Sequence, residues 1–442
     1  MLDMKKSVYI LGMFFLMLFA TSCLDKAGTT STLISDEAKI TRFYLYSDSI
    51  EDIDEYVFTI DNDSMLIYNY DSIDYGTRID SLSFVVTPRF SAIYVNDSID
   101  FYNSSGVVLD FNQRIKITVV AKDEKESADY YVQVNVHKVD PDTFVWKGVK
   151  SEVFAGDATK AKAVYFNGKL VYMAVVADKL VAYESEDGAE WSMIETVGID
   201  VDLAALDLDY LVATDGYLYV SANGRLYQSA DASEWVLVET SGEAVENLLF
   251  GMENKVYGVT TDRVLARLDG SEWVALGALP SRFPVEGGAV LVAAAPSGKE
   301  RAFVVGGIDA EGNYLSSVWS SEDGAYWSDM AGGKEMFTPR AYAALAQYAG
   351  GLMLFGGVTK AEGVDVKVVE DAQLYSKDYG LNWGDPKDKS TIGDLYVPRY
   401  EHSAVVTPAG YIYLIGGRAS EGATINDVWR GMNYASLPGF RR

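Results

Sequence analysis

Cysteine and histidine are almost absent from this chain. Its 442 residues include one cysteine, Cys23, and two histidines, His137 and His402. A single cysteine excludes an internal disulfide and a site of several thiolates, and two histidines exclude a histidine-rich zinc centre. A Ser-His-Asp triad would depend on His402 alone. We therefore predict no metal and no cofactor, and we assign no catalytic residue.

Basic residues are scarce as well. The chain has 37 lysines and arginines against 64 aspartates and glutamates, which gives a formal net charge of −27. A surface with this charge repels nucleic-acid phosphates and anionic lipid headgroups, so we expect no nucleic-acid partner. It also favours a soluble monomer. The acidic clusters lack an intact Asp-x-Asp-x-Asp-Gly calcium loop, and we interpret them as solvated surface.

Proline is rare in comparison with glycine and tyrosine. The chain has 10 prolines, 39 glycines and 30 tyrosines, and aromatic residues make up 13% of it. This composition favours short strands joined by tight turns over helical bundles. We therefore predict an all-β protein, whose length suits two or three domains.

The N-terminus carries a long apolar run. Residues 8–20 are apolar, two lysines precede them, and Thr21-Ser22-Cys23 follows. This order is typical of an export signal, and the run is too short to span a bilayer comfortably. The junction resembles a bacterial lipobox, which implies that a signal peptide over residues 1–22 is removed and that Cys23 is acylated. The membrane would then be contacted only through the lipid anchor. The alternative is an ordinary signal peptide with an incidental cysteine.

Two segments with different patterns follow Cys23. Residues 23–35 are small and polar, and we expect a flexible tether. Residues 36–140 alternate apolar and polar side chains in short runs, which indicates an antiparallel sandwich of about seven strands. The clearest runs are residues 40–46, 56–60, 83–87, 114–120 and 130–136. The last two resemble the terminal hairpin of bacterial immunoglobulin-like domains, which implies an immunoglobulin-like β-sandwich.

A short motif recurs through residues 141–442. Its copies lie about 40 to 55 residues apart, which is the period of a propeller blade. Each aspartate can accept backbone N–H groups of a tight turn, and each tryptophan can pack at the next strand. The motif resembles the Asp-box Ser-x-Asp-x-Gly-x-x-Trp, which implies a structural role at the blade periphery; only the last copy has the full spacing. The expected structural residues are Asp187, Trp191, Asp231, Trp235, Asp269, Trp273, Asp323, Trp327, Asp378, Gly380 and Trp383.

Three glycine pairs mark a second repeat. Each follows an apolar strand, and diglycine lets neighbouring blades pack backbone to backbone. Two of the three units begin with Pro339-Arg340 and Pro398-Arg399. The pattern resembles kelch repeats over about residues 281–431. The pairs are Gly306-Gly307, Gly356-Gly357 and Gly416-Gly417.

Together the two repeats predict a kelch/Asp-box-type β-propeller of about six blades over residues 141–442, although a count of seven stays open. Residues 143–149 resemble the outer strand that the last unit lacks, so we predict that they complete the last blade and close the ring. The whole chain resembles uncharacterised two-domain lipoproteins of Gram-negative gut bacteria. This resemblance implies a place at the outer membrane, on either its periplasmic or its external face.

We interpret the propeller as a non-catalytic binding head for a glycan or for an envelope or extracellular protein. Propellers bind ligands at the ends of the central axis, where kelch openings begin the innermost strands. The candidate ligand-binding residues are Arg340, Tyr342, Arg399, Glu401, His402 and Arg418. For each of them the alternative is a structural role between neighbouring blades.

Two other functions remain open. The protein could be a scaffold subunit of an outer-membrane complex, or a glycan-cleaving enzyme of the sialidase type. A sialidase needs three converging arginines, and Arg282, Arg340 and Arg399 lie at equivalent points of three adjacent units. A repeat places equivalent residues there in any case, and the sialidase Phe-Arg-Ile-Pro segment is absent. We therefore favour binding over catalysis.

Overall fold

The computed structural model describes residues 36–140, 143–294, 298–361, 364–369, 373–384, 392–393 and 395–433. The chain forms two compact units, Met1–His137 and Lys138–Arg442. The predicted signal peptide, Cys23 and the predicted tether lie outside the described residues. Within the described ranges, no helix is long and apolar enough to cross a membrane. Apart from the short 3-10 helix η1 (Leu203–Ala205), the elements of these ranges are strands, which confirms the all-β class.

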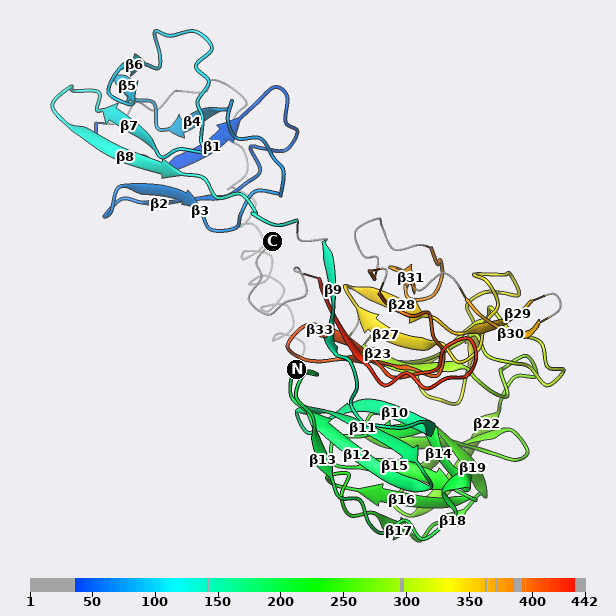
Figure 1. Cartoon of the computed structure of the whole chain (residues 1–442). Coiled ribbons are helices and arrows are strands. Elements are labelled where there is room, and N and C mark those ends of the chain that lie inside the picture. The colour runs from blue at the N-terminus through cyan, green and yellow to red at the C-terminus, as the bar shows by residue number, and fades with distance from the viewer. Residues whose placement is uncertain are drawn as a thin grey trace, which may run out of the picture. The chain divides into compact units, whose positions relative to one another are not determined.

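The first unit consists of two sheets that share one core (Figure 1). Its strands alternate in burial: in β7, Ile115, Ile117 and Val119 are buried, whereas the residues between them face outward. Neighbouring strands are antiparallel, except for the parallel pair β3–β8. The small sheet pairs β1 (Arg42–Tyr46) with β4 (Ser83–Thr87), and the larger one has the order β2 (Phe58–Asp61), β3 (Leu66–Asn69), β8 (Ser127–Gln133), β7 (Ile115–Val120), β5 (Ala92–Val95) and β6 (Ile99–Asp100).

The sheets of the second unit share one pattern, in which an innermost strand is followed by strands that lie progressively further out. From the inside outward, the first two sheets are β10 (Ala158–Phe166), β11 (Lys169–Val176), β12 (Lys179–Ser185), β13 (Ser192–Ile194), and β14 (Leu206–Ala213), β15 (Leu218–Ala222), β16 (Arg225–Ser229), β17 (Val236–Val238). The next two are β19 (Val245–Met252), β20 (Lys255–Thr260), β21 (Val264–Asp269), β22 (Glu272–Ala278), β18 (Ser241–Gly242), and β23 (Ala289–Ala294), β24 (Glu300–Val305), β25 (Val318–Ser321), β26 (Ser328–Asp329). The last two are β27 (Ala344–Tyr348), β28 (Gly351–Phe355), β31 (Gln373–Ser376), and β32 (Ser403–Val406), β33 (Tyr411–Ile415), β34 (Val428–Asn433), β9 (Phe144–Lys150).

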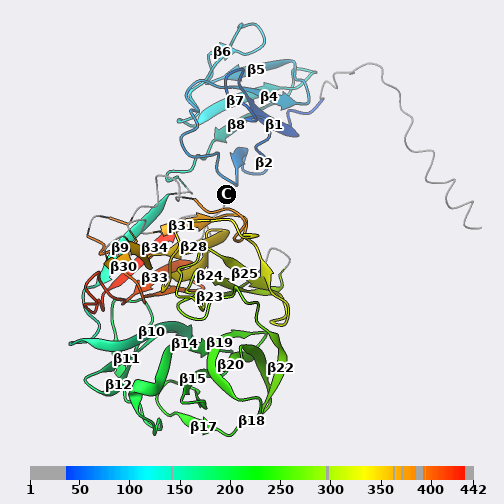
Figure 2. The same cartoon turned by 90° about the vertical axis from the view of Figure 1, so that its right-hand side faces the viewer.

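The innermost strands form a closed ring. β10 contacts β14, β14 contacts β19, and the series continues through β23, β27 and β32 back to β10. Figure 2 shows β10, β14, β19 and β23 next to one another toward the middle of the unit. Sheets arranged in this way around a central axis form a β-propeller.

The first strand of the second unit completes its last sheet. β9 pairs antiparallel with β34, with Phe144 opposite Asn433 and Lys150 opposite Val428. In Figure 1, β9 lies beside the red strands near the end of the chain. This is the pairing that the sequence predicts for residues 143–149. Its hydrogen bonds join the two ends of the propeller segment and so hold the ring closed.

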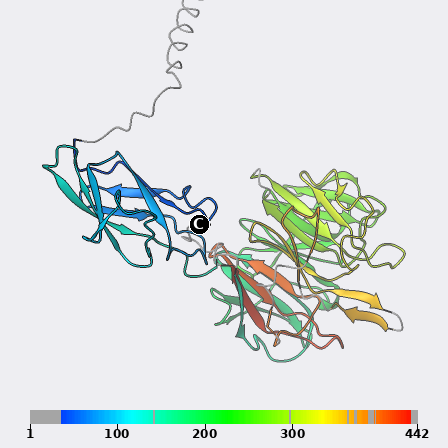
Figure 3. The same ribbon diagram turned by 90° about the horizontal axis from the view of Figure 1, so that it is seen from above.

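One hairpin of the second unit stands apart from the radial sheets. β29 (Val358–Ala361) and β30 (Val364–Val368) pair with each other in a two-stranded sheet. The hairpin lies in the chain between β28 and β31, directly after Gly356-Gly357. Figure 3 shows it in yellow and orange, projecting from the side of the propeller. It is therefore an insertion that leaves the radial pattern of its sheet unchanged.

The repeated aspartates hold tight turns in four of the five motif copies. Asp187 accepts hydrogen bonds from the backbone nitrogens of Ala189 and Glu190 at 2.8 and 3.1 Å, and Trp191 Nε1 donates to the carbonyl of Gly188 at 2.8 Å. The copies at Asp231, Asp323 and Asp378 use their carboxylates in the same way. These residues therefore have structural contacts in the turns.

The copy at Asp269 is a correction to the sequence analysis. Its carboxylate does not cap a turn but pairs with the side chains of Arg267 and Lys255. An arginine stands at position 267, where the other copies have a serine, and it attracts the carboxylate across two residues. Asp269 and Glu272 are directly paired across a two-residue hairpin turn between β21 and β22. Trp273 is still buried, so the packing role of the motif survives without its turn.

Candidate functional site

The central channel of the propeller contains a cavity of about 510 Å³. Residues of the ring of inner strands line it, and most of them are alanine, valine or leucine. Its polar lining includes Lys162 and Tyr165 of β10, Asp209 and Tyr210 of β14, Gln347, His402 and Ser403. The wall therefore combines apolar side chains with polar groups that can orient a small molecule.

Two aspartates lie in an irregular part of β14, and one of them, Asp209, borders the cavity. The register of β14 against β15 shifts between Asp207 and Val212, and such an irregularity changes the direction of the side chains beside it. The backbone nitrogen of Asp209 donates to Asp207 Oδ1 at 3.1 Å, which ties the two residues together. Asp207 is half-buried and Asp209 is exposed. The bulge therefore places two carboxylates at one end of the channel, which we call the mouth.

The Pro-Arg segments that precede β27 and β32 place Tyr342 and Glu401 at the same mouth. Both have left-handed backbones, with φ of 55° and 54°, as does Gly287 at the equivalent point of the preceding unit. The nitrogen of Tyr342 donates to the carbonyl of Gly287 at 2.7 Å, and the nitrogen of Glu401 donates to the carbonyl of Tyr342 at 2.9 Å. The Tyr342 hydroxyl donates to the carboxylate of Glu286. A chain of hydrogen bonds thus holds the mouth across three adjacent sheets.

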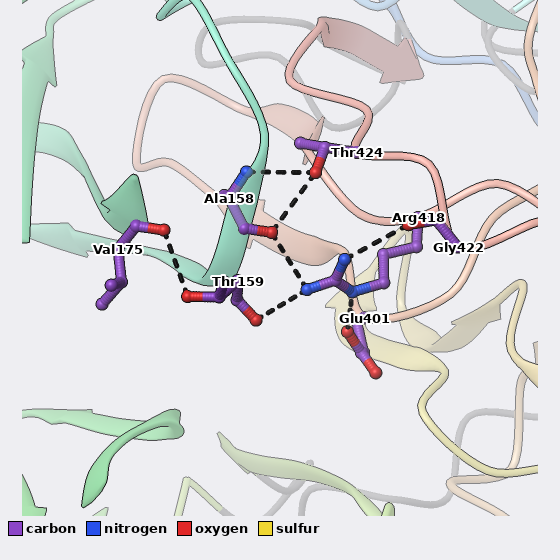
Figure 4. A network of polar contacts seen from close by, with 7 residues as sticks. All are labelled: Ala158, Thr159, Val175, Glu401, Arg418, Gly422 and Thr424. Atoms are coloured by element: carbon purple, nitrogen blue, oxygen red, sulfur yellow. Dashed lines mark hydrogen bonds and ion pairs between the residues drawn. The ribbon is translucent and has the colours of Figure 1, made fainter. Parts of the chain in front are cut away.

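Arg418 joins the mouth to the first sheet of the propeller. Figure 4 shows its guanidinium group between Glu401 and the backbone of β10. Its Nε donates to Glu401 Oε2 at 2.6 Å, and its Nη2 donates to the carbonyls of Ala158 at 3.0 Å and Thr159 at 2.6 Å. Arg418 therefore fixes Glu401 in position, and most of its own donors are occupied.

The charged groups of the mouth interact with one another. Burial lowers the pKa of Lys162, although Asp209, Asp207 and Glu401 act in the opposite direction. Burial also raises the pKa of Glu401, against the effect of Arg418. Burial and the hydrogen bond to Glu286 raise the pKa of Tyr342, so its hydroxyl remains a donor at neutral pH. Among the described residues, no group of three or more His, Cys, Asp or Glu side chains is placed to hold a metal ion.

Arg340 and Arg399 lie inside the sheets instead of at the mouth. Both are 0% exposed. The Arg340 guanidinium donates to the carbonyl of Gly356 at 3.2 Å, and that of Arg399 donates to the carbonyl of Gly416 at 3.1 Å. The backbone carbonyl of Arg340 accepts a hydrogen bond from the nitrogen of Gly307 at 2.8 Å, and that of Arg399 accepts one from the nitrogen of Gly357 at 3.0 Å. These donors belong to the diglycine of the preceding unit in each case. Each arginine thus links two diglycine turns, and we leave both out of the proposed site.

His402 borders the cavity but is 2% exposed. Neither of its ring nitrogens has a hydrogen-bond partner among the described residues. Burial, followed by the charges of Arg399 and Lys162, holds its pKa well below the usual range, so the ring is neutral. His402 can therefore shape the wall of the channel but brings no charge to it.

The burial of Asp207 leads to a prediction about pH. Burial and the neighbouring Asp209 raise its pKa from 3.8 to about 6. Between these values the folded protein keeps a proton that the unfolded chain has lost, so stability falls as the pH rises from about 4 to 6, by roughly 3 kcal/mol at most. Asp207→Asn should lack this fall. Urea unfolding of both proteins from pH 4 to 7 checks it, and parallel curves would contradict it.

Sequence analysis missed Lys162, Asp207, Asp209 and Glu286. The first three lie in sheets without a preceding Pro-Arg segment, where no motif marks the start of the inner strand. The only local signal is that polar residues alternate with apolar ones at the start of β10 and β14. The candidate residues that the structure does bring to the mouth are Tyr342, Glu401 and Arg418.

Comparison with known proteins gives the family. The family model described as the DUF6242 beta propeller domain matches residues 140–440. The chain belongs to the DUF6242 family. The N-terminal domain model of the same family, a domain of unknown function, matches residues 26–134. These matches confirm the predicted order of an N-terminal domain followed by a β-propeller.

Other comparisons with the DUF6242 protein are more distant. A solved structure described as "Structure of YjhT" has 13% sequence identity and a TM-score of 0.48, and the match covers 63% of this chain and 96% of that chain. No curated protein matches the chain. The ligand and the cellular location therefore have to be argued from the residues themselves.

Proposed function

We propose that the DUF6242 propeller binds a small, uncharged, hydroxyl-rich ligand, such as the terminal unit of a glycan, at the mouth of its channel. The observation that carries this proposal is the combination of Lys162, Asp209 and Glu401 around the end of a cavity of about 510 Å³. Sugar hydroxyls both donate and accept hydrogen bonds, so they suit carboxylate acceptors beside the N–H donors of an amine. Tyr210 and Tyr342 supply aromatic surface next to these groups.

The charge of the mouth argues for a neutral ligand. Asp207, Asp209, Glu286 and Glu401 outnumber Lys162 and Arg418, and the whole chain has a formal net charge of −27. An acidic sugar would be repelled, whereas a neutral one would not. The sialidase alternative gains no support, because Arg340 and Arg399 are fully buried and the side chain of Arg282 is 65% exposed beside Asp329. Three arginines do not converge in the described structure.

We propose that the rest of the chain holds the propeller at the membrane. Signal cleavage leaves Cys23 as a lipid anchor at the outer membrane, and the first unit is an immunoglobulin-like spacer. The propeller itself has six kelch/Asp-box blades. The pairing of β9 with β34 supports the six-blade count, since it places both ends of the propeller in one sheet. Two sheets around one core support the immunoglobulin-like sandwich. The protein acts as a monomer.

A glycan array tests the proposal. The chain from residue 30 to 442 should bind at least one neutral glycan, and Asp209→Asn or Glu401→Gln should weaken binding roughly 10- to 100-fold, as the loss of a charged hydrogen bond does. Asp262→Asn is the matched control, because it removes an exposed carboxylate outside the mouth. Equal binding by all variants would place the ligand elsewhere. A silent array would favour the scaffold alternative, which copurification of an outer-membrane protein would then test.

A further inference from the structure

Lys162 differs from the other lysine on its strand. It borders the cavity, and its ammonium group has neither an ion pair nor a hydrogen bond with any residue in the described ranges. Lys160, two residues earlier, donates to the carbonyls of Ala204 at 2.7 Å and Leu206 at 2.5 Å. On the same strand, the amine of Lys160 is therefore hydrogen-bonded, whereas the amine of Lys162 borders the cavity without such a bond.

The surroundings of Lys162 lower its pKa and so increase the uncharged share of its amine. The charged and titratable groups that act on it are Asp207 and Asp209 from β14 and Glu401 from the residues before β32. None of these carboxylates makes an ion pair with it, and burial outweighs their attraction, so its pKa is lowered. A neutral amine with a free lone pair is the nucleophilic state of lysine.

We propose that Lys162 is a nucleophilic amine that forms a reversible imine with an aldehyde or ketone bound in the channel, such as the open-chain form of a reducing sugar. The Nζ lone pair forms a bond to the carbonyl carbon as the C=O π bond breaks, and a proton lost by the nitrogen goes to the carbonyl oxygen to give a carbinolamine. Loss of water then leaves the C=N bond. No electrons are gained or lost overall, and water hydrolyses the imine in the reverse direction.

The carboxyl groups of the mouth are suited to the proton transfers. Burial raises the pKa of Glu401, and burial with the neighbouring Asp209 raises the pKa of Asp207 to about 6, so a fraction of Asp207 is protonated near neutral pH. Such a group can protonate the departing hydroxyl and take the proton back during hydrolysis. This inference rests on the proposed function only because it takes the same cavity as the ligand site.

Reductive trapping tests the inference. The full chain is treated with limiting glycolaldehyde and sodium cyanoborohydride at pH 7, and the modified lysines are located by peptide mass spectrometry. Lys162 should be modified several-fold faster than the exposed Lys179, because its lowered pKa leaves more of its amine uncharged and because it borders a cavity that holds the aldehyde. Lys160 should react slowly, because its amine is engaged. Modification of Lys162 no faster than of Lys179 would overturn the inference, and this comparison needs no variant.

Two variants and a second ligand complete the test. Lys162→Met should remove the fast adduct, whereas Lys160→Met should keep it; a fast adduct that persists in folded Lys162→Met overturns the assignment. A methyl glycoside of an array-positive sugar cannot open to an aldehyde. If the methyl glycoside binds but glycolaldehyde does not trap Lys162, the proposed function stands and this inference fails. If Lys162 is trapped and no glycan binds, the inference stands and the glycan proposal fails.

Discussion

Arg399→Ala is expected to lower the free energy of unfolding by roughly 3–5 kcal/mol, the usual effect of removing one partner from a buried ion pair. The Arg399 guanidinium is 0% exposed and holds Asp427 through both of its terminal nitrogens. It also donates to the carbonyls of Val397 at 2.9 Å and Gly416 at 3.1 Å. Alanine would leave a carboxylate and two carbonyls without these donors. Urea unfolding measures the loss.

Arg282→Ala is the matched control for Arg399. Arg282 pairs with Asp329 at 3.5 Å, and its side chain is 65% exposed. Exposed ion pairs contribute about 0–1 kcal/mol, so this variant should unfold almost as the wild type does. Similar losses for both variants would mean that burial does not decide the contribution of these arginines. A folded Arg399→Ala protein that loses glycan binding alone would return Arg399 to the ligand site.

Gly356→Ala is expected to destabilise the propeller by about 3–5 kcal/mol, from the sum of two effects. The residue has a φ of 57°, a left-handed conformation that disfavours a side chain. A Cβ atom there would lie 2.1 Å from the backbone carbonyl oxygen of Arg399, which cannot move without opening the contact between two sheets. Thermal or urea unfolding would show the loss, and poor soluble expression would accompany it.

Gly350→Ala separates the two effects. Gly350 has a φ of 76°, yet a Cβ atom on it would meet nothing within 4 Å. This variant should therefore show only the backbone effect, about 1–2 kcal/mol. If the two glycine variants lose the same stability, close approach between sheets is not what requires the diglycine. If Gly356→Ala loses more, the difference measures the steric cost of that contact.

The residues singled out by the resemblance to kelch repeats are only partly those that the structure places at the mouth. The resemblance directed attention to Tyr342, Glu401 and Arg418, which the structure brings together at one end of the channel. It also suggested Arg340 and Arg399, whose guanidinium groups turn into the protein to reach diglycine carbonyls. A repeat reveals which positions are equivalent, but it does not reveal which way a side chain turns. That direction depends on acceptors from distant segments.

The Asp-box resemblance was similarly informative at four copies and wrong at one. Asp187 and Asp323 cap turns through local backbone contacts, so seven residues of sequence were enough to predict them. At Asp269 a nearby Arg267 and a cross-strand Lys255 compete for the carboxylate. A charged partner forms a stronger hydrogen bond than a neutral backbone group, and the turn changes accordingly.

Local patterns in the chain were enough to establish the all-β class, the two-domain order and the repeating sheets of this protein. Those features depend on side-chain alternation within one strand and on spacing between successive turns, both of which are local. Contacts between distant segments were needed to bring Lys162, Asp209 and Glu401 to one mouth. Lys162 and Glu401 belong to the first and last sheets, and they meet because β9 pairs with β34 and the inner strands close into a ring. Residues 143–149 predicted the closing pair by their resemblance to an outer strand, but which side chains meet at the mouth depends on contacts between all the sheets at once, and no local pattern records that.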